Sequence, residues 1–176
     1  MQQKYYIYRL AQDIEVASFN STDAELNDFL ISEAKAYQDE MLAVTFIVRE
    51  QVSGDIVAYY SLLNDTIRFG NDDKAVRNRI NRKIPHSKQR NSYPAIKLGR
   101  LAVDERFAGK GIGMQILREI AYLYVNNEKS SGCRFITVDA VASAIGFYER
   151  FGFRLFTERD ANEDTRQMYF DLLNAK

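Results

Sequence analysis

The sequence predicts an α/β protein in which a mixed β-sheet is flanked by helices. Short runs rich in aromatic and β-branched residues alternate with segments of helical periodicity, in the order β-α-β-β-β-α-β-α-β-β. This order combines hairpin connections with helical crossovers, and the two together produce a mixed sheet. With 46% hydrophobic and 12% aromatic residues, the chain of 176 residues can fill a hydrophobic core.

The first half of the chain is predicted to hold one helix and three strands. Thr22 and Glu25 have the spacing of a capping box, which predicts a helix that runs to about Gln38 with apolar side chains along one face. The three strands are Tyr5–Arg9, Leu42–Glu50 and Asp55–Leu62. A turn that contains Ser53 and Gly54 separates the last two strands, so we expect these to form a hairpin.

The second half is predicted to hold four strands and two helices. The strands are Ala95–Val103, Arg134–Ala140, Phe153–Thr157 and Arg166–Leu172, and the helices are Gly111–Asn126 and Ser143–Arg150. Apolar residues recur along one face of the longer helix, which predicts that this face is buried. A loop over Asp104–Lys110 leads into that helix, and Ser143 is expected to be the N-cap of the shorter one.

Composition and charge exclude several classes of protein. The 24 basic and 24 acidic residues cancel, so the net charge gives no reason to expect a membrane surface or a nucleic acid as partner. A single cysteine excludes an intramolecular disulfide and a cysteine-based zinc site, and a single histidine excludes a multi-histidine metal site. Without a recognisable repeat, linker, signal peptide or membrane span, we expect one cytoplasmic domain over residues 1–176, with no metal.

One segment departs from this neutral balance. The stretch from Lys74 to Arg100 contains no acidic residue and nine basic residues, namely Lys74, Arg77, Arg79, Arg82, Lys83, Lys88, Arg90, Lys97 and Arg100. Two interpretations are open at this point. The stretch is either a solvated surface helix and loop, or a patch that faces phosphate groups.

Three alternate glycines, Gly109, Gly111 and Gly113, lie where a loop ends and a helix begins. The helix dipole and the free backbone N–H groups favour an anion there, and glycine lets it approach closely, so the pattern predicts a phosphate site. A tight turn with close helix packing would use the same residues. A Walker loop is excluded because Lys110 is followed by Gly111, and the G-x-G-x-G spacing differs from the dinucleotide fingerprint.

Two ordered motifs resemble the GNAT superfamily of N-acetyltransferases. Leu98–Asp104 followed by Ala108–Gly113 is similar to the family's acetyl-coenzyme A segment, and Ala144–Phe153 is similar to its F-Y-x-x-x-G-F segment. Shorter stretches resemble the subgroup that includes the acetyltransferase toxins of bacterial toxin–antitoxin pairs: Leu26–Leu30, Ala58–Leu62, Tyr93–Ala95 and Val138–Ala140. The resemblance covers roughly residues 20–171 and implies the GNAT fold, with a mostly antiparallel sheet splayed at the acetyl-coenzyme A strand.

The resemblance also implies which residues bind the co-substrate acetyl-coenzyme A. The strand edge of Leu101, Ala102 and Val103 would pair with the pantetheine arm, and Ser143 would touch that arm. The residues that would hold the pyrophosphate are Ala108, Gly109, Lys110, Gly111, Ile112 and Gly113. The family usually has Gln or Arg at the position of Ala108, so one polar contribution is missing here, and Arg106 is the side chain that could compensate.

Tyr148 matches the residue that acts on the leaving thiolate in this family. The family reaction is direct attack of an amine on the thioester, through a tetrahedral intermediate. A phenol of pKa about 10 is a weaker acid than a thiol of pKa about 8.5, so complete proton transfer would cost roughly 2 kcal/mol, and a hydrogen bond suffices. Ala144, Phe147, Tyr148 and Phe151 also have the spacing of a buried helix face, so a purely structural role is the alternative.

No motif identifies the amine acceptor. No general base stands out among Glu149, Asp139 and His86. At pH 7 about 14% of α-amines are neutral, compared with roughly 0.04% of lysine side chains. The lack of a clear base therefore favours an α-amine as acceptor. We expect acetyl transfer to a primary amine of a small molecule or peptide. Alternatives are toxin-like acetylation of the α-amine of an aminoacyl-tRNA and a catalytically silent acyl-coenzyme A binding module. A homodimer is compatible with the sequence, and a membrane partner is not expected.

Overall fold

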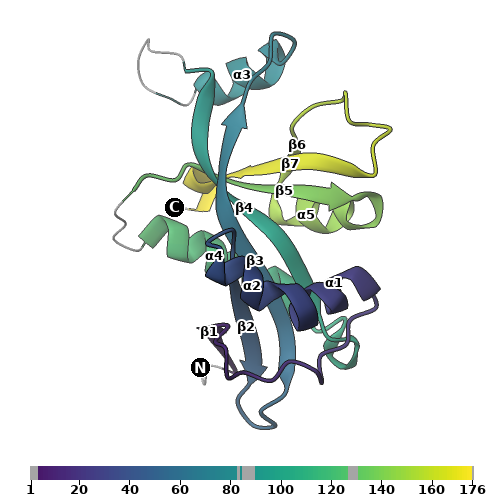
Figure 1. Ribbon diagram of the computed structural model, residues 1–176. Helices are drawn as coiled ribbons and strands as arrows, with labels where there is room; N and C mark the ends of the chain where they lie inside the picture. The colour runs from purple at the N-terminus through teal and green to yellow at the C-terminus, as the bar shows by residue number, and fades with distance from the viewer. Residues whose placement is uncertain (1–3, 83, 85–89, 127–130, 176) are drawn as a thin grey trace. The chain divides into compact units, whose positions relative to one another are not determined.

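The computed structural model describes residues 4–82, 84, 90–126 and 131–175 (Figure 1). The chain divides into two compact units, each of which is described by itself. Unit 1 comprises Met1–Leu63 and Leu98–Glu119, and unit 2 comprises Asn64–Lys97 and Ile120–Lys176. The expectation of one domain over residues 1–176 stays a prediction.

In the described part of the chain, seven strands form the sheet, in the order β1-β2-β3-β4-β5-β7-β6. Their bounds are β1 Tyr5–Arg9, β2 Val44–Glu50, β3 Ile56–Arg68, β4 Ser92–Val103, β5 Phe135–Val141, β6 Arg154–Leu155 and β7 Thr165–Asp171. The pairs β1–β2, β2–β3, β5–β7 and β6–β7 are antiparallel, whereas β4 and β5 are parallel. The predicted mixed, mostly antiparallel sheet is therefore confirmed.

The helices connect these strands. The α-helices are α1 Ala24–Asp28, α2 Ala34–Asp39, α3 Lys74–Asn81, α4 Ile112–Asn126 and α5 Ile145–Phe151. The π-helical turn η1 is Phe29–Glu33, and the 3₁₀ turns are η2 Glu105–Phe107, η3 Ala142–Ala144 and η4 Leu172–Ala175. Within the described part of the chain, no helix is long and apolar enough to span a membrane.

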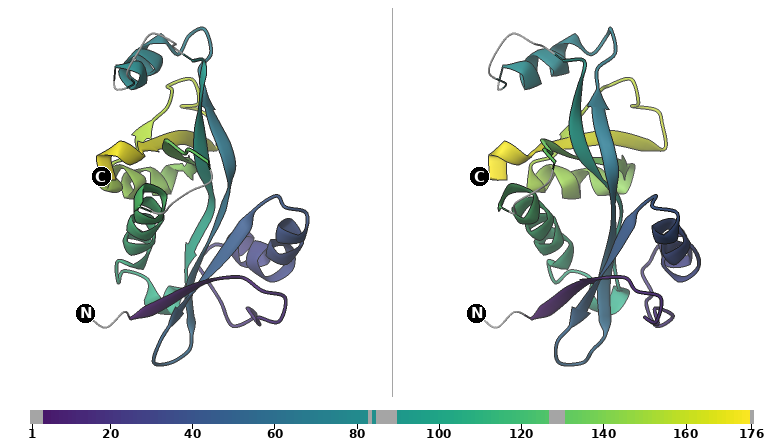
Figure 2. Two further views of the ribbon diagram at one scale, coloured as in Figure 1. Left: turned by 90° about the vertical axis from the view of Figure 1, so that its left-hand side faces the viewer. Right: turned by 60° about the vertical axis from the view of Figure 1, so that its left-hand side comes forward.

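In unit 1, helices cover both faces of the sheet (Figure 2). Phe29 and Leu30 of the first helical segment belong to the same buried cluster as Ile47 of β2. Because side chains alternate along a strand, the next residue, Val48, points to the other face, where it lines a groove with Ile116 of α4. The two faces of β2 thus position the first helical segment on one side and the start of α4 on the other.

Unit 2 shows the same alternation on β7. Tyr169 belongs to a buried cluster that includes Val76 and Ile80 of α3. The ring of the next residue, Phe170, lies 5.0 Å from that of Phe151 at the end of α5. Aromatic residues supply much of the core here, as the composition predicted, and their rings meet mainly edge-on or tilted, which is the favoured arrangement.

The first helical segment differs from the sequence prediction at its start and in its middle. The predicted capping box at Thr22 is wrong, because Asp23 is the N-cap and its carboxylate accepts hydrogen bonds from the backbone N–H groups of Glu25 (2.9 Å) and Leu26 (3.2 Å). A charged cap also interacts favourably with the helix dipole, which a threonine does not. The expected continuous α-helix is interrupted by the π-helical turn Phe29–Glu33.

The end of α2 is a Schellman motif. The N–H of Met41 donates to the carbonyl of Gln38 (3.0 Å), and the N–H of Leu42 donates to the carbonyl of Tyr37 (2.8 Å). Met41 has a φ of 57°, in the left-handed region where glycine is usual. No other non-glycine residue among those described has a positive φ. Its side chain is 92% exposed.

Candidate active site

The residues expected to pair with the pantetheine arm, Leu101–Val103, form the end of β4 in unit 1. The pairing of β4 with β5 covers Ala95–Lys97 only, whereas β5 pairs with β7 as far as Val141. Within the described residues, β4 beyond Lys97 therefore has one edge without a partner strand, and backbone N–H and C=O groups on that edge are available to a ligand. This is the splay that the resemblance implied.

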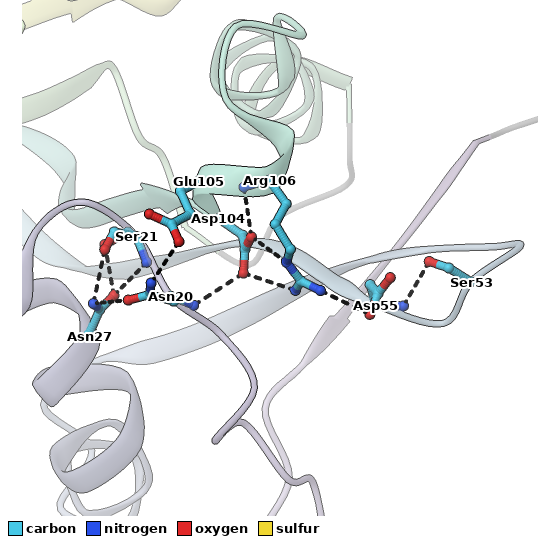
Figure 3. Close-up of polar contacts among 8 residues, drawn as sticks. All are labelled: Asn20, Ser21, Asn27, Ser53, Asp55, Asp104, Glu105 and Arg106. Atoms are coloured by element: carbon cyan, nitrogen blue, oxygen red, sulfur yellow. Dashed lines mark hydrogen bonds and ion pairs between the residues drawn. The ribbon is translucent and has the colours of Figure 1, made fainter.

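A buried carboxylate fixes the chain where β4 ends (Figure 3). Asp104 is fully buried and accepts hydrogen bonds from the backbone N–H groups of Asn20 (3.1 Å) and Arg106 (3.0 Å), and from Nε (2.8 Å) and Nη2 (3.0 Å) of Arg106. Burial would raise the pKa of Asp104, but the hydrogen bonds from Arg106 and Asn20 outweigh it and lower that pKa. An ionised Asp104 therefore directs the chain from the strand into the glycine loop.

Arg106 does not take the role that the sequence suggested for it. Besides Asp104, its guanidinium forms an ion pair with Asp55 at 3.5 Å. The hydrogen bond to Asp104 is the main reason why the pKa of Arg106 is raised above its usual value. We conclude that this side chain is held by two carboxylates, so it is not placed to replace the polar residue missing at Ala108. Sequence reasoning missed both Asn20 and Asp55, because only the fold brings them to this turn.

A second set of polar contacts joins the same turn to the start of α1 (Figure 3). Nδ2 of Asn20 donates to Glu105 (3.0 Å), and Nδ2 of Asn27 donates to Asn20 (3.0 Å). Oδ1 of Asn27 accepts from both the backbone N–H and the hydroxyl of Ser21, each at 2.8 Å. The 3₁₀ turn that precedes the glycine loop is thus anchored on α1 as well as on β4.

The glycine loop has the backbone that its sequence requires. Gly109 and Gly111 have φ values of +75° and +77°, a region that other residues rarely adopt. Apart from the glycine and its two chain neighbours, a Cβ atom at either position would have no described atom within 4 Å, so the requirement is conformational and the adjoining space is open. Ala108–Gly111 are exposed and α4 begins at the buried Ile112, with Gly113 half-buried after it. The first N–H groups of α4 therefore face a solvent-accessible loop.

Lys110 lies in the same loop and contacts a neighbouring aromatic ring. Its ammonium group lies 4.5 Å from the ring centroid of Phe107, which is buried at the end of the 3₁₀ turn. A cation–π contact of this kind holds the side chain near the loop without neutralising its charge. Lys110 consequently adds a positive charge beside the N-terminus of α4, which favours an anion at that place.

Tyr148 belongs to α5 in unit 2. Its side chain is 7% exposed, and its ring lies 5.1 Å from that of Phe147 and 5.3 Å from that of Phe153. Burial raises the pKa of Tyr148 to about 12. Relative to a thiol of pKa about 8.5, complete proton transfer from such a phenol would cost about 5 kcal/mol. The environment therefore keeps the hydroxyl protonated, as a hydrogen-bond donor must be, and opposes its use as a full proton donor.

Ser143 is not the N-cap that the sequence predicted. It is the middle residue of the 3₁₀ turn Ala142–Ala144, and the N-cap of α5 is Ala144, whose side chain makes no capping hydrogen bond. The chain enters α5 through a tighter turn, so the cap position moves by one residue and the exposed Ser143 hydroxyl is free of that task. Its contact with the cofactor arm stays a prediction. Unit 1 holds the predicted residues from Leu101 to Gly113, and unit 2 holds Ser143 and Tyr148.

The structure describes two of the three suggested general bases. Asp139 forms an ion pair with Lys97, and Glu149 is an exposed residue of α5. His86 lies outside the described residues. Among the residues that the structure describes, no group of three or more His, Cys, Asp and Glu side chains could hold a metal ion.

The basic stretch divides into residues with and without partners. Lys97 is paired with Asp139, and the Arg100 guanidinium lies 3.7 Å from the ring centroid of Phe29 in unit 1. Lys83 and Lys88 fall outside the described residues, and Arg90 is exposed. Four cations from α3 and its C-cap form no ion pair with any described residue: Lys74, Arg77, Arg79 and Arg82.

Comparison with known proteins now identifies the family. Residues 43–155 match the family described as Acetyltransferase (GNAT) domain. The chain belongs to the GNAT acetyltransferases. This acetyltransferase is 29% identical to a tRNA-acetylating toxin of Mycobacterium tuberculosis over a match of 148 residues. The match covers 84% of this chain and 82% of the toxin.

Two solved structures share the GNAT fold of this acetyltransferase. The toxin AtaT complexed with acetyl-methionyl-tRNA matches with a TM-score of 0.78 at 20% identity, over 97% of this chain and 96% of that one. The second structure is a tyrosine-to-phenylalanine variant of AtaT bound to acetyl-coenzyme A and to the C-terminus of the antitoxin AtaR. It matches with a TM-score of 0.72 at 18% identity, over 98% of this chain and 96% of that one. The expected resemblance to the toxin subgroup is confirmed, and the protein is an acyltransferase that uses acetyl-coenzyme A.

Proposed function

We propose that this GNAT acetyltransferase transfers the acetyl group of acetyl-coenzyme A to the α-amine of an aminoacyl-tRNA. The observation that carries the choice of acceptor is the set of four α3 cations without ion-pair partners among the described residues, in a chain whose net charge is zero. Unpaired Lys and Arg side chains clustered on one helix are the electrostatic footprint of a polyphosphate ligand. The similarity to a tRNA-acetylating toxin supports the same acceptor.

The proposed binding of acetyl-coenzyme A uses the two features of unit 1 described above. The unpaired edge of β4 at Leu101–Val103 would pair with the amide groups of the pantetheine arm, as an added strand does. The left-handed glycines Gly109 and Gly111 leave open space at the N-terminus of α4, where the backbone N–H groups would bind the pyrophosphate. Lys110 would add a positive charge there.

The proposed chemistry is direct acyl transfer. The amine nitrogen attacks the thioester carbonyl, the C–N bond forms, the C–S bond breaks, and the proton lost by the nitrogen balances the proton gained by the departing thiol. A backbone N–H of β4 would stabilise the tetrahedral oxyanion, because a fixed donor costs no reorganisation at the moment of reaction. Tyr148 would donate a hydrogen bond to the thiolate while keeping its own proton.

An α-amine fits the absence of an obvious base among the residues that the structure describes. Asp139 is already engaged with Lys97, and Glu149 faces solvent. About 14% of amines with a pKa of about 7.8 are neutral at pH 7, so an α-amine needs little help to become a nucleophile, whereas a lysine side chain needs much more.

The experiment combines a reaction with a binding measurement. Purified protein is incubated with acetyl-coenzyme A and aminoacyl-tRNA, thiol release is followed, and the mass of the aminoacyl group is measured after hydrolysis. We expect acetylation, and tRNA affinity that falls steeply between about 50 and 200 mM salt. The triple variant with Lys74, Arg77 and Arg82 changed to Gln should bind tRNA more weakly, with a flatter salt dependence.

A matched control removes the same charge elsewhere. Arg68, Arg118 and Arg150 are exposed and lie outside α3, so their triple change to Gln should leave the salt dependence near that of the wild type. Acetylation of free amines without any acetylation of aminoacyl-tRNA would assign a small-molecule acceptor. Binding of acetyl-coenzyme A without thiol release for any amine would indicate a silent acyl-coenzyme A binding module.

A further inference from the structure

A groove in unit 2 lies beside α3 and the β6–β7 hairpin. Its polar lining residues are Arg79, Arg154, Tyr169, Asp171 and Asn174. It contains none of the residues that the resemblance assigned to acetyl-coenzyme A. Because β6 pairs with β7 so that Arg154 lies opposite Tyr169, the sheet brings an exposed arginine to the same groove as Arg79.

Arg79 is held in this groove rather than free in solvent. Its Nε donates to the hydroxyl of Tyr169 at 2.9 Å, and its guanidinium carbon lies 5.5 Å from the centroid of the same ring. Tyr169 is 4% exposed, so the anchor is itself rigid. Burial raises the pKa of Tyr169, and the charges of Arg79 and Arg154 act against that rise, which places both arginines near one phenol. The two Nη groups of Arg79 are bonded to none of the described residues.

The carboxylate in the groove does not neutralise these arginines. Both oxygens of Asp171 accept from Arg134, at 2.7 Å from Nε and 3.0 Å from Nη2. The positive charge of Arg134 therefore balances the negative charge of Asp171 in a side-on pair. Neither Arg79 nor Arg154 forms an ion pair with a described residue, so two guanidinium groups keep their charge within one groove.

We infer that this groove binds a phosphate group of the acceptor RNA, with Arg79 and Arg154 as its two guanidinium ligands. Planar guanidinium forks match phosphate geometry, and an arginine whose orientation is already fixed loses less entropy on binding. The inference rests on the proposed function for the identity of the ligand, because RNA supplies such a group either as an internal phosphodiester or as a 5′-terminal phosphate. It goes beyond that function by naming the place and the ligands.

The first test does not depend on RNA. Inorganic phosphate is titrated into the ¹⁵N-labelled full chain, and the arginine Nε–H resonances are followed by NMR. We expect the resonances of Arg79 and Arg154 to shift together in one saturable process, and that of Arg68, an exposed arginine outside the groove, to stay unchanged.

The second test uses RNA and matched variants. Arg79→Gln and Arg154→Gln should each weaken the binding of a tRNA acceptor-stem hairpin and reduce the slope of log affinity against log salt by about one, whereas Arg68→Gln should leave that slope unchanged. Arg79→Lys keeps the charge but not the fork, so it should keep the slope and still lose affinity. Repeating the series with 5′-hydroxyl RNA separates the sources, because the effect of Arg79→Gln disappears there only if the ligand is the terminal phosphate.

The outcomes of these tests distinguish failure of the proposed acceptor from failure of the phosphate-binding groove. If the wild type neither binds nor acetylates tRNA but phosphate shifts Arg79 and Arg154, the proposed acceptor is rejected and the anion-binding groove is upheld. If tRNA is acetylated but phosphate shifts neither arginine and both glutamine variants behave as Arg68→Gln, the proposed function stands and the groove is rejected.

Discussion

Among single residues, Tyr148 combines burial with a retained proton. Because its pKa is raised to about 12, the phenol stays protonated throughout the usual assay range, so tyrosine ionisation should not lower the rate below about pH 11. Burial of the ring also explains why sequence periodicity favoured a packing role. Both properties belong to one side chain, so only removal of the hydroxyl alone separates them.

The variant Tyr148→Phe makes that separation. The packing against Phe147 and Phe153 is kept, so affinity for acetyl-coenzyme A should change little, while kcat and kcat/KM fall together by about 10²-fold or more. Thiol-release kinetics measure both constants. Tyr122→Phe, at a position 61% exposed, is the control and should keep its rate. Unchanged turnover in Tyr148→Phe would leave this residue with a packing role only.

Gly111 allows a similarly direct comparison. Gly111→Ala and Gly54→Ala both place a Cβ in open space at nearly the same left-handed φ, +77° and +74°, so each should lose about 1 kcal/mol of folding stability. Only Gly111→Ala should also weaken coenzyme A binding, because Gly54 lies in the β2–β3 turn. Thermal unfolding and calorimetric titration check the two effects. Equal coenzyme A affinity in both variants would place the pyrophosphate elsewhere.

At the scale of elements, α3 is tied to the β6–β7 loop through Asp73. The side chain of Asp73 is 4% exposed, accepts the Gly70 N–H at 2.6 Å and pairs with Arg159. Asp73→Ala would leave that N–H without its acceptor and would remove the closer of the two ion pairs of Arg159, so we expect a loss of about 2 kcal/mol. Hydrogen exchange of α3 should become faster. Asp72→Ala, at a side chain 83% exposed, should change neither quantity.

Element boundaries were predictable where a local pattern determines them. The bounds of β1, Tyr5–Arg9, agree with the prediction, and α4 begins one residue after its predicted start. The prediction ended β3 at Leu62, six residues before its end at Arg68, because Asn64 and Asp65 resemble turn residues. Pairing in the sheet overrides that local preference. The π-helical turn had no sequence signal, since helical periodicity does not distinguish it.

The same limit applies to the candidate site. Glycine spacing and motif order located the loop Ala108–Gly113 and the strand before it, because those requirements are local. The role of Arg106 could not be predicted. Its partner Asp104 is two residues away, but Asp55 and the backbone of Asn20 reach that turn only in the folded chain.

For the whole molecule, Asp104 links stability to pH. Its pKa is lowered in the folded state, so the ionised carboxylate stabilises the folded chain. This stabilisation is fully present above the unfolded-state pKa of about 3.9 and is lost as pH falls through the lower folded-state pKa. We expect Asp104→Asn to lose about 2 to 3 kcal/mol at pH 7, and to lose less further stability than the wild type on acidification. Denaturant unfolding at pH 7, 5 and 3.5 measures this, and parallel curves for both proteins would contradict it.

The Schellman motif at the end of α2 marks a position where the protein is open to engineering. Met41 occupies a left-handed position at an energetic cost that glycine would not incur, and its largely exposed thioether adds an oxidisable apolar group to the surface. Met41→Gly should therefore raise the melting temperature by about 2 to 4 °C, which corresponds to roughly 1 kcal/mol in a chain of this size. Differential scanning calorimetry would measure it, and a lower melting temperature would mean that the methionine side chain stabilises the helix end.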